Sequence, residues 1–334
     1  MFTNARAAGL PMLGGVDFFV PSANGDVRAH YWAADWSPRD PNDQHGYPAN
    51  FRADGKKTGA ATMVILPGFT EFCEKYSRDI LRLHQSGFNV LVIDWPGQGL
   101  SGHFGKNPLA VHCDDFAVYL AALDAVIEAA GLGEDRLFLF GHSMGGHLAL
   151  RYAARRPRHT LGVILTAPMM APPVMPIWLI RGLSAFLLKA GLGCAYPPFH
   201  RVPALDRVRQ FRPDNKLTRW KQGYESQFFW FDDIPKLRRN GPTVGWVNAA
   251  YHSSAHYTMN ADWLRSIHVP VLAFVAGDEQ IVSASATDYA LPFIPHLERH
   301  DFAGARHELL HELPEVTDQL WVSLFAFCAK HACP

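Results

Sequence analysis

The stretch R-L-F-L-F-G-H-S-M-G-G-H-L-A-L, residues 136–150, decides the fold of this chain. Its apolar run at 137–140 has the length and composition of a buried parallel strand, and a helix-like segment follows. Ser143 therefore lies at the apex of a sharp turn between a strand and a helix. Side chains at Gly141 and Gly145 would collide with the neighbouring strand and helix, so both positions require glycine. The setting predicts a catalytic serine held above the edge of a sheet.

Strand and helix patterns alternate on both sides of this turn. Strands are predicted at 61–66, 88–94, 162–166 and 269–276, and a shorter one near 297–302. Helical spacing is present at 72–85, 116–131, 285–291 and 313–330. An Asn-Gly turn between 16–20 and 27–32 predicts an opening hairpin, and 36–58 reads as a surface loop. We therefore expect an α/β fold with a mostly parallel sheet and helices on both faces.

The alternation stops between residues 168 and 263. This segment is rich in proline and contains five of the nine tryptophans. We expect residues 168–263 to form a helical cap over the carboxyl edge of a core made of 1–167 and 264–334. Its apolar side chains either form the core of the cap or face an acyl site or a membrane surface. The candidates for substrate contact are Trp178, Phe186 and, beyond the cap, Ile281.

The composition excludes several classes of protein. Lysine plus arginine equals aspartate plus glutamate, at 31 each, so no attraction to nucleic acid is expected. The five cysteines lack paired spacing, which argues against a disulfide framework or a zinc site and favours a reducing cytosol. The N-terminus is a poor signal peptide, and the apolar segment 177–192 is too short and too charged to span a bilayer. We expect a cytoplasmic protein whose cap can touch a membrane surface; no oligomeric state is predicted.

A serine hydroxyl becomes a good nucleophile only when a base removes its proton and a carboxylate orients that base. Asp278 directly follows the strand predicted at 269–276, and His307 lies in the loop before the last helix. The order Ser143, Asp278, His307 is the one expected for a nucleophile on such a turn. These residues would supply nucleophile, acid and base, so neither a metal nor an organic cofactor is expected.

Alternatives exist for the acid and the base. Asp278 could instead be a turn or N-cap residue. Other histidines near the predicted site are His296, His300 and His311. His142 and His147 flank the serine too closely to act as its base. His307 remains the expected base because it combines a loop with the required place in the chain.

Acyl transfer also needs two donors for the developing oxyanion. The backbone N–H of Met144 is one, because it directly follows the nucleophile. The second is expected from the loop after the strand at 61–66. We assign it to Phe69, because Gly68 allows the backbone to approach closely.

Five motifs together resemble the bacterial lysophospholipase and monoacylglycerol lipase family of α/β hydrolases. They are P-G-F-T-E-F-C-E-K-Y (67–76), D-W-P-G-Q-G-L-S (94–101), G-H-S-M-G (141–145), A-G-D-E-Q-I-V (276–282) and A-R-H-E-L-L (305–310). The resemblance implies an α/β-hydrolase fold with a cap, the triad Ser143, Asp278 and His307, and an oxyanion hole at Phe69 and Met144. It implies hydrolysis of a lysophospholipid or a monoacylglycerol through an acyl-enzyme.

The chain departs from the family pattern at three positions. Pro67 and Phe72 stand where the family usually has histidine, and Pro96 stands where it has arginine. Two other functions remain open. One is a small-ester esterase or an aminopeptidase-like amidase with the same triad, and the other is a noncatalytic ligand-binding relative. Dehalogenase or epoxide hydrolase chemistry would require aspartate at position 143.

Overall fold

The computed structural model describes residues 3–11, 14–22, 25–35, 60–102, 107–173, 176–198, 200–201 and 205–332. The loop predicted at 36–58 lies outside these residues.

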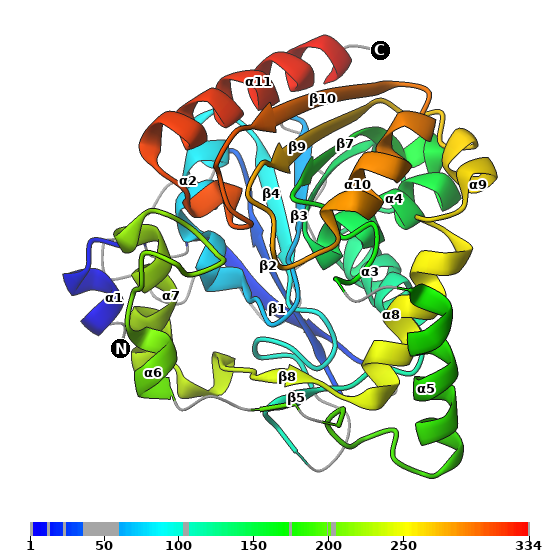
Figure 1. The fold of residues 1–334 in the computed structure, drawn as a ribbon. Coiled ribbons are helices and arrows are strands. Elements are labelled where there is room, and N and C mark those ends of the chain that lie inside the picture. The colour runs from blue at the N-terminus through cyan, green and yellow to red at the C-terminus, as the bar shows by residue number, and fades with distance from the viewer. Residues whose placement is uncertain are drawn as a thin grey trace.

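An eight-stranded sheet runs through the middle of the molecule (Figure 1). In chain order its strands are β1 (Val16–Val20), β2 (Val27–Trp32), β3 (Thr62–Leu66), β4 (Asn89–Ile93), β6 (Leu137–His142), β7 (Thr160–Thr166), β9 (Val271–Ala276) and β10 (Leu297–Phe302). Their order across the sheet is β1-β2-β4-β3-β6-β7-β9-β10. β2 pairs antiparallel with β1 and β4, and the other neighbouring pairs are parallel. The predicted parallel sheet and its opening hairpin are therefore confirmed.

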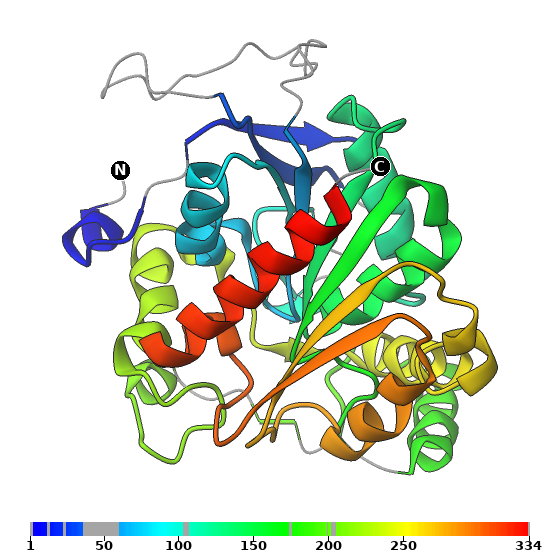
Figure 2. The same cartoon turned by 90° about the horizontal axis from the view of Figure 1, so that it is seen from above.

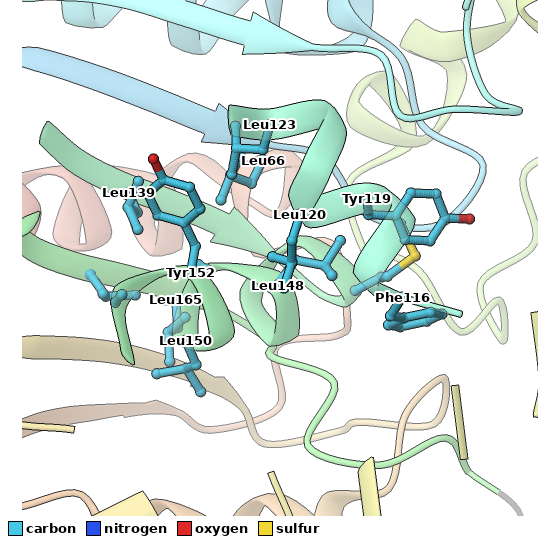
Figure 3. Close-up of a cluster of buried hydrophobic side chains, with 14 of the residues drawn as sticks. Leu66, Phe116, Tyr119, Leu120, Leu123, Leu139, Leu148, Leu150, Tyr152 and Leu165 are labelled. Atoms are coloured by element: carbon cyan, nitrogen blue, oxygen red, sulfur yellow. The ribbon is translucent and has the colours of Figure 1, made fainter. Parts of the chain in front are cut away.

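Helices cover both faces of the sheet (Figure 2). α2 (Ser77–Gln85) and α11 (Pro314–Ala332) pack on one face. α3 (Ala117–Ala129), α4 (Met144–Arg155) and α10 (Ala284–Ala290) pack on the other. Figure 3 shows the second layer, in which Leu123 of α3 and Leu148 of α4 belong to one cluster with Leu66 and Leu139 of the sheet. This is the expected α/β-hydrolase architecture, with an apolar core on each side of the sheet.

The direction of winding reverses between β3 and β6. From β3 the chain passes through α2 to β4 on one side, and then through α3 to β6 on the other side of β3. Such a reversal leaves the loops after the two neighbouring strands free to diverge, and ligands bind there in open α/β sheets. The loops after β3 and β6 carry Phe69 and Ser143, so the topology brings the predicted oxyanion donor and nucleophile together.

The segment between β7 and β9 is mainly helical. Its helices are α5 (Ile177–Lys189), α6 (Leu205–Arg209), α7 (Lys221–Asp233), α8 (Val244–His256) and α9 (Ala261–Arg265). α5 and α8 lie together on one flank, and α6 and α7 lie on the other beside α1 (Thr3–Ala7) (Figure 1). Between the flanks, the short strand β8 (Gly241–Pro242) pairs in parallel with β5 (Ala110–Val111). β5 lies before residue 168, so the predicted cap also pairs with a part of the chain outside it. The cap boundaries at 168 and 263 stay a prediction.

Short 3-10 turns connect several of these elements. They are η1 (Cys73–Tyr76), η2 (Pro157–His159), η3 (Pro235–Leu237), η4 (Leu291–Phe293) and η5 (Leu309–His311). In the part of the chain that the structure describes, no helix combines the length and apolarity needed to cross a membrane.

Asp79 of α2 is a buried carboxyl group with an incomplete set of partners. Its side chain lies in the interior, and its Oδ2 has no hydrogen-bond partner among the described residues. Burial raises the pKa of Asp79 to about 6, against the opposing charges of His311, Arg78 and Arg82. Ionising this group in the folded protein is therefore unfavourable.

We expect Asp79→Asn to stabilise the protein in a pH-dependent way. Between the ordinary carboxyl pKa and about 6, the folded state binds more protons than the unfolded state. The native Asp79 therefore destabilises the protein increasingly over this pH range, and by a constant amount at higher pH. Removing the charge should raise the free energy of unfolding by about 3 kcal/mol at pH 8 and by about half of that at pH 5. Urea titrations at the two pH values measure the difference. An equal change at both would show that the carboxyl charge is not the cause.

Candidate active site

The predicted nucleophile lies on a strained turn. Ser143 follows β6 and precedes α4, with φ 52° and ψ −116°. A Cβ at Gly141 would lie 2.5 Å from the Gly145 carbonyl oxygen, and a Cβ at Gly145 would overlap the Leu66 carbonyl group of β3. These collisions confirm why both flanking positions are glycine. The turn holds Ser143 at the carboxyl end of the sheet, next to β3.

Backbone strain gathers at three neighbouring strand ends. Among the described non-glycine residues, Thr70, Ser143 and Ala167 have positive φ angles of 66°, 52° and 43°. They follow β3, β6 and β7, which are adjacent in the sheet. Such strain persists only where the surrounding structure enforces it, and it is common at functional sites. The strained segments therefore mark one edge of the sheet as the site.

The loop after β3 presents a free backbone donor at Phe69. The Gly68 N–H donates to the Glu71 carboxylate, and the Thr70 N–H donates to Gln98 Oε1. The Phe69 N–H between them has no acceptor among the described residues. Met144 is the first residue of α4, where a backbone N–H has no acceptor within the helix. Both N–H groups predicted for the oxyanion hole are thus without an acceptor among the described residues.

The predicted base is paired with a buried carboxylate. His307 Nδ1 lies 2.7 Å from Glu279 Oε2, and both side chains are buried. The N–H groups of Ile281 and Val282 donate to Glu279 Oε1 at 2.7 and 3.1 Å. Burial opposes ionisation of Glu279, but the hydrogen bond and charge of His307, with these two N–H groups, lower its pKa. The carboxylate is therefore held charged and in a fixed orientation against the imidazole.

The choice of Asp278 as the acid needs correction. Its carboxylate binds Gln280 Nε2 at 2.8 Å and Arg306 Nε at 3.3 Å, and its side chain is 41% exposed. The Gln280 hydrogen bond and the Arg306 charge lower its pKa at the surface. Strand β9 ends at Ala276, and the turn that follows directs Asp278 to solvent and the next residue, Glu279, to His307.

The other histidines near the serine have different partners. His142 is buried, and its ring lies 4.9 Å from the His307 ring between centroids. His147 bonds to Ser253 Oγ at 2.6 Å, and burial with the nearby Arg151 lowers its pKa to about 3. His311 Nε2 faces the Lys75 carbonyl oxygen at 3.4 Å. Among these histidines, His307 is the one that contacts Glu279.

The candidates for substrate contact lie in different environments. Trp178 and Phe186 on α5 are 72% and 67% exposed, so they lie on the surface of the molecule. Ile281 is partly buried against the core, and its backbone supports Glu279. Trp246 of α8, which the sequence did not single out, packs against Phe69 with ring centroids 4.3 Å apart. The helical segment therefore contacts the loop after β3 directly.

One group of potential metal ligands lies beside the site. Glu71, His142 and Glu308 bring ligand atoms within 4.8 Å of one another. The Lys75 ammonium lies between the two carboxylates, 2.6 Å from Glu71 Oε1 and 2.7 Å from Glu308 Oε1. The lysine therefore occupies the place between the carboxylates where a cation would bind.

Several known lipid and ester hydrolases are similar to this chain. Lysophospholipase L2 of Escherichia coli strain K12 is 28% identical over 288 residues, which cover 81% of each chain. A soluble variant of monoglyceride lipase from Saccharomyces cerevisiae, solved with a substrate analogue, aligns with a TM-score of 0.67 over 96% of this chain and 97% of that one, at 16% identity. A thermostable carboxyl esterase from Bacillus coagulans, solved with glycerol, aligns with a TM-score of 0.70 over 96% of this chain and all of its own, at 15% identity. The solved structures show that the fold is shared.

The family is established by sequence. Residues 58–314 match the sequence profile of Hydrolase_4, described as serine aminopeptidase, S33. The matched region includes the loop after β3, the serine turn, the helical segment and both Glu279 and His307. Because it spans well over half of the chain, the protein belongs to the Hydrolase_4 (serine aminopeptidase, S33) family and has the α/β-hydrolase fold.

Proposed function

We propose that this protein is a serine hydrolase that cleaves the ester bond of single-chain lipids, a lysophospholipid or a monoacylglycerol. The observation that carries the chemistry is the buried His307–Glu279 pair, 2.7 Å apart, beside a serine turn with two free backbone donors. The E. coli relative, a lysophospholipase, supports the substrate class, because the alignment covers 81% of each chain. In this proposal Ser143 is the nucleophile, His307 the base and Glu279 the acid.

The first half of the reaction forms an acyl-enzyme. A carboxylate only accepts hydrogen bonds, so the His307 Nδ1 that faces Glu279 carries a proton and Nε2 remains the basic atom. His307 removes the Ser143 hydroxyl proton as Oγ bonds to the ester carbonyl carbon. The carbonyl oxygen becomes an oxyanion, which the N–H groups of Phe69 and Met144 stabilise. The bond to the alkoxy oxygen then breaks, and the proton on His307 passes to the departing alcohol.

The second half releases the fatty acid. Water takes the place of the alcohol, and His307 removes its proton as the oxygen attacks the acyl carbon. The same two N–H groups stabilise the second oxyanion. Breaking the bond to Ser143 Oγ returns the proton to the serine and frees the acid. Glu279 stays ionised throughout and stabilises the transient imidazolium.

A substrate panel tests the proposal. The purified protein would be assayed with p-nitrophenyl esters of increasing chain length, lysophosphatidylcholine, a monoacylglycerol and an aminoacyl anilide, each beside Ser143→Ala as the blank. Preferred cleavage of the long single-chain lipids supports the lipid assignment. Preference for short esters or for the anilide would support the serine mechanism but reject single-chain lipids as the substrate. No turnover on any member would favour a noncatalytic binding protein.

The structure gives less support to an aminopeptidase, although the family name includes one. A peptidase needs acidic groups that are free to bind the substrate amine. The adjacent acids of α7 are engaged: Asp232 forms an ion pair with Arg209, and Asp233 accepts the backbone N–H groups of Asn4 and Ala5 at 3.0 and 2.9 Å. The most evident acidic pair of the helical segment is therefore occupied by the chain itself.

We further propose that α5 contacts the lipid surface from which the substrate is taken. The helix presents Trp178, Leu179, Leu183 and Phe186 to solvent, whereas its one buried residue is Ser184. From residue 168 to 205 the sequence has no aspartate or glutamate but contains Arg181 and Lys189, which favours an anionic surface. We assign Trp178 and Phe186 to this contact in preference to the acyl site.

Removing the two largest apolar side chains tests this contact. Trp178→Ser combined with Phe186→Ser is expected to weaken binding to phosphatidylcholine vesicles containing phosphatidylglycerol by about 10–100-fold, because each side chain loses its burial in lipid. Flotation with the vesicles measures binding. Val322→Ser on α11 is the matched control, because Val322 is 70% exposed and α11 lies away from α5 (Figure 1). Equal loss in the control, or no loss in the double variant, would reject the surface contact.

A further inference from the structure

A buried charged cluster lies between the two loops that carry the proposed chemistry. We call Glu71, Lys75, Tyr76 and Glu308 the bridging cluster. Lys75 Nζ donates to Glu71 Oε1 at 2.6 Å and to the two Glu308 oxygens at 2.7 and 2.8 Å. The Tyr76 hydroxyl donates to the second Glu71 oxygen. The lysine therefore joins a carboxylate from the loop after β3 to a carboxylate from the loop before α11.

The Glu71 end of the cluster holds the oxyanion loop. Glu71 Oε2 accepts the Gly68 N–H, one residue before the free N–H of Phe69. A Cβ at Gly68 would lie 2.8 Å from the same oxygen, so a larger residue there would displace the Glu71 carboxylate. On the other side of Phe69, Gln98 Oε1 accepts the Thr70 N–H, and Thr70 keeps a positive φ of 66°. Fixing both neighbours sets the direction in which the Phe69 N–H points.

The Glu308 end of the cluster lies against the base. Glu308 directly follows His307 in the chain, and its Oε2 lies 3.9 Å from His142 Nε2. The same His142 nitrogen lies 3.7 Å from Glu71 Oε1, and the His142 ring packs on the His307 ring at 4.9 Å between centroids. His142 immediately precedes the nucleophile. The cluster thus contacts the oxyanion loop, the strand before the serine and the base loop at once.

The ionisation states agree with a permanent bridge. Burial disfavours all three charges, but the attraction of Lys75 lowers the pKa of both Glu71 and Glu308, and the two carboxylates raise the pKa of Lys75. Burial lowers the pKa of His142, so this imidazole is neutral beside them. A buried ion pair with each charge satisfied on several sides is rigid, and breaking one partner leaves the other uncompensated.

We propose that the bridging cluster is a positioning device, in which Lys75 and Glu71 align the Phe69 N–H of the oxyanion hole with the base loop. This inference rests on the proposed function, because it assigns Phe69 the role of oxyanion donor. The cluster does not touch the substrate. It acts through Gly68, so its loss reduces stabilisation of the transition state more than binding of the ester.

The test separates positioning from stability. Glu71→Ala and Lys75→Met are expected to lower kcat by about 10–100-fold with KM unchanged within about threefold. A trifluoromethyl ketone, which adds to Ser143 and places a charged oxygen in the oxyanion hole, should lose affinity in proportion to kcat/KM. Lys75→Arg, which keeps a cation between the carboxylates, should restore most of the activity. Glu74→Ala is the matched control, because Glu74 lies on the same turn and is buried against Arg28 at 2.7 Å.

The Glu74→Ala control should lose thermal stability without a change in kcat or in affinity for the trifluoromethyl ketone. If Glu71→Ala or Lys75→Met does not fold, Tyr76→Phe removes one hydrogen bond to Glu71 with little change in volume, and a fall of about 3–10-fold in both kcat and inhibitor affinity is expected. Unchanged inhibitor affinity in the variants that fold would overturn the inference. So would losses that match those of Glu74→Ala. An inactive wild-type protein that does not bind the ketone would instead refute the proposed function.

Discussion

Ser143→Ala is expected to lower kcat/KM for the preferred ester by about 10⁴-fold or more while the protein keeps its fold. The reason is that, in the proposed mechanism, the Ser143 hydroxyl forms the acyl-enzyme, whereas it contributes little to stability. Its Oγ makes no hydrogen bond within the described residues, and alanine adopts the strained backbone at φ 52° no less readily than serine. Steady-state kinetics and a urea titration measure the two expectations separately.

Covalent labelling makes this prediction specific. A fluorophosphonate should add one mass increment to the tryptic peptide that contains Ser143, and the Ser143→Ala protein should remain unlabelled. Asn260→Ala is a control for loss of stability alone. Asn260 caps α9 by accepting the N–H groups of Asp262 and Trp263, and it takes no part in the proposed mechanism. That variant should be less stable but fully labelled. A label on another serine, or activity in Ser143→Ala near that of the wild type, would refute the assignment of the nucleophile.

Glu279→Gln is expected to lower kcat by about 10³–10⁴-fold, whereas Asp278→Asn should leave it within about threefold. The amide of glutamine can donate a hydrogen bond to His307 Nδ1, which stabilises the tautomer with its proton on Nε2. That tautomer cannot accept the serine proton. Asp278 instead binds Gln280 and Arg306 at the surface, so its replacement leaves the imidazole untouched. The two variants are therefore matched, since they are neighbouring acids converted to their amides.

The same pair of variants decides which carboxylate is the acid. Steady-state kinetics on one p-nitrophenyl ester suffice, provided that both proteins show the wild-type urea midpoint within error. A large loss in Asp278→Asn with an active Glu279→Gln would restore the acid expected from the sequence. Equal and small losses of kcat in both variants would show that neither carboxylate takes part in the mechanism and that His307 acts without an acid partner.

Local sequence was sufficient for the serine turn and for the class of fold. Gly141, Ser143 and Gly145 between an apolar run and a helical segment specify a strand, a tight turn and a helix, because only glycine fits against the neighbouring backbone. The alternating pattern gave the strands of the sheet within a few residues of their ends. The same pattern placed His307 in the loop before the last helix, which is a property of chain order.

The acid could not be chosen from the same information. Asp278 and Glu279 are consecutive acids after one strand, and consecutive side chains leave the backbone in different directions. Which one reaches His307 depends on the turn after β9 and on the Ile281 and Val282 N–H groups that bind Glu279. The role of the apolar residues in the helical segment could not be chosen from the sequence either. A residue such as Trp178 is compatible with a core, an acyl site or a lipid surface until the packing of α5 is known.

The sequence by itself determined the serine turn at 141–145 and the parallel α/β sheet, because both depend on short-range backbone sterics and on periodic burial. Only the tertiary structure decided that Glu279 meets His307, that α5 exposes its apolar face and that Lys75 bonds to both Glu71 and Glu308, the latter 233 residues further along the chain. Those contacts join side chains from distant segments, and their distances and burial follow from how the layers pack against one another.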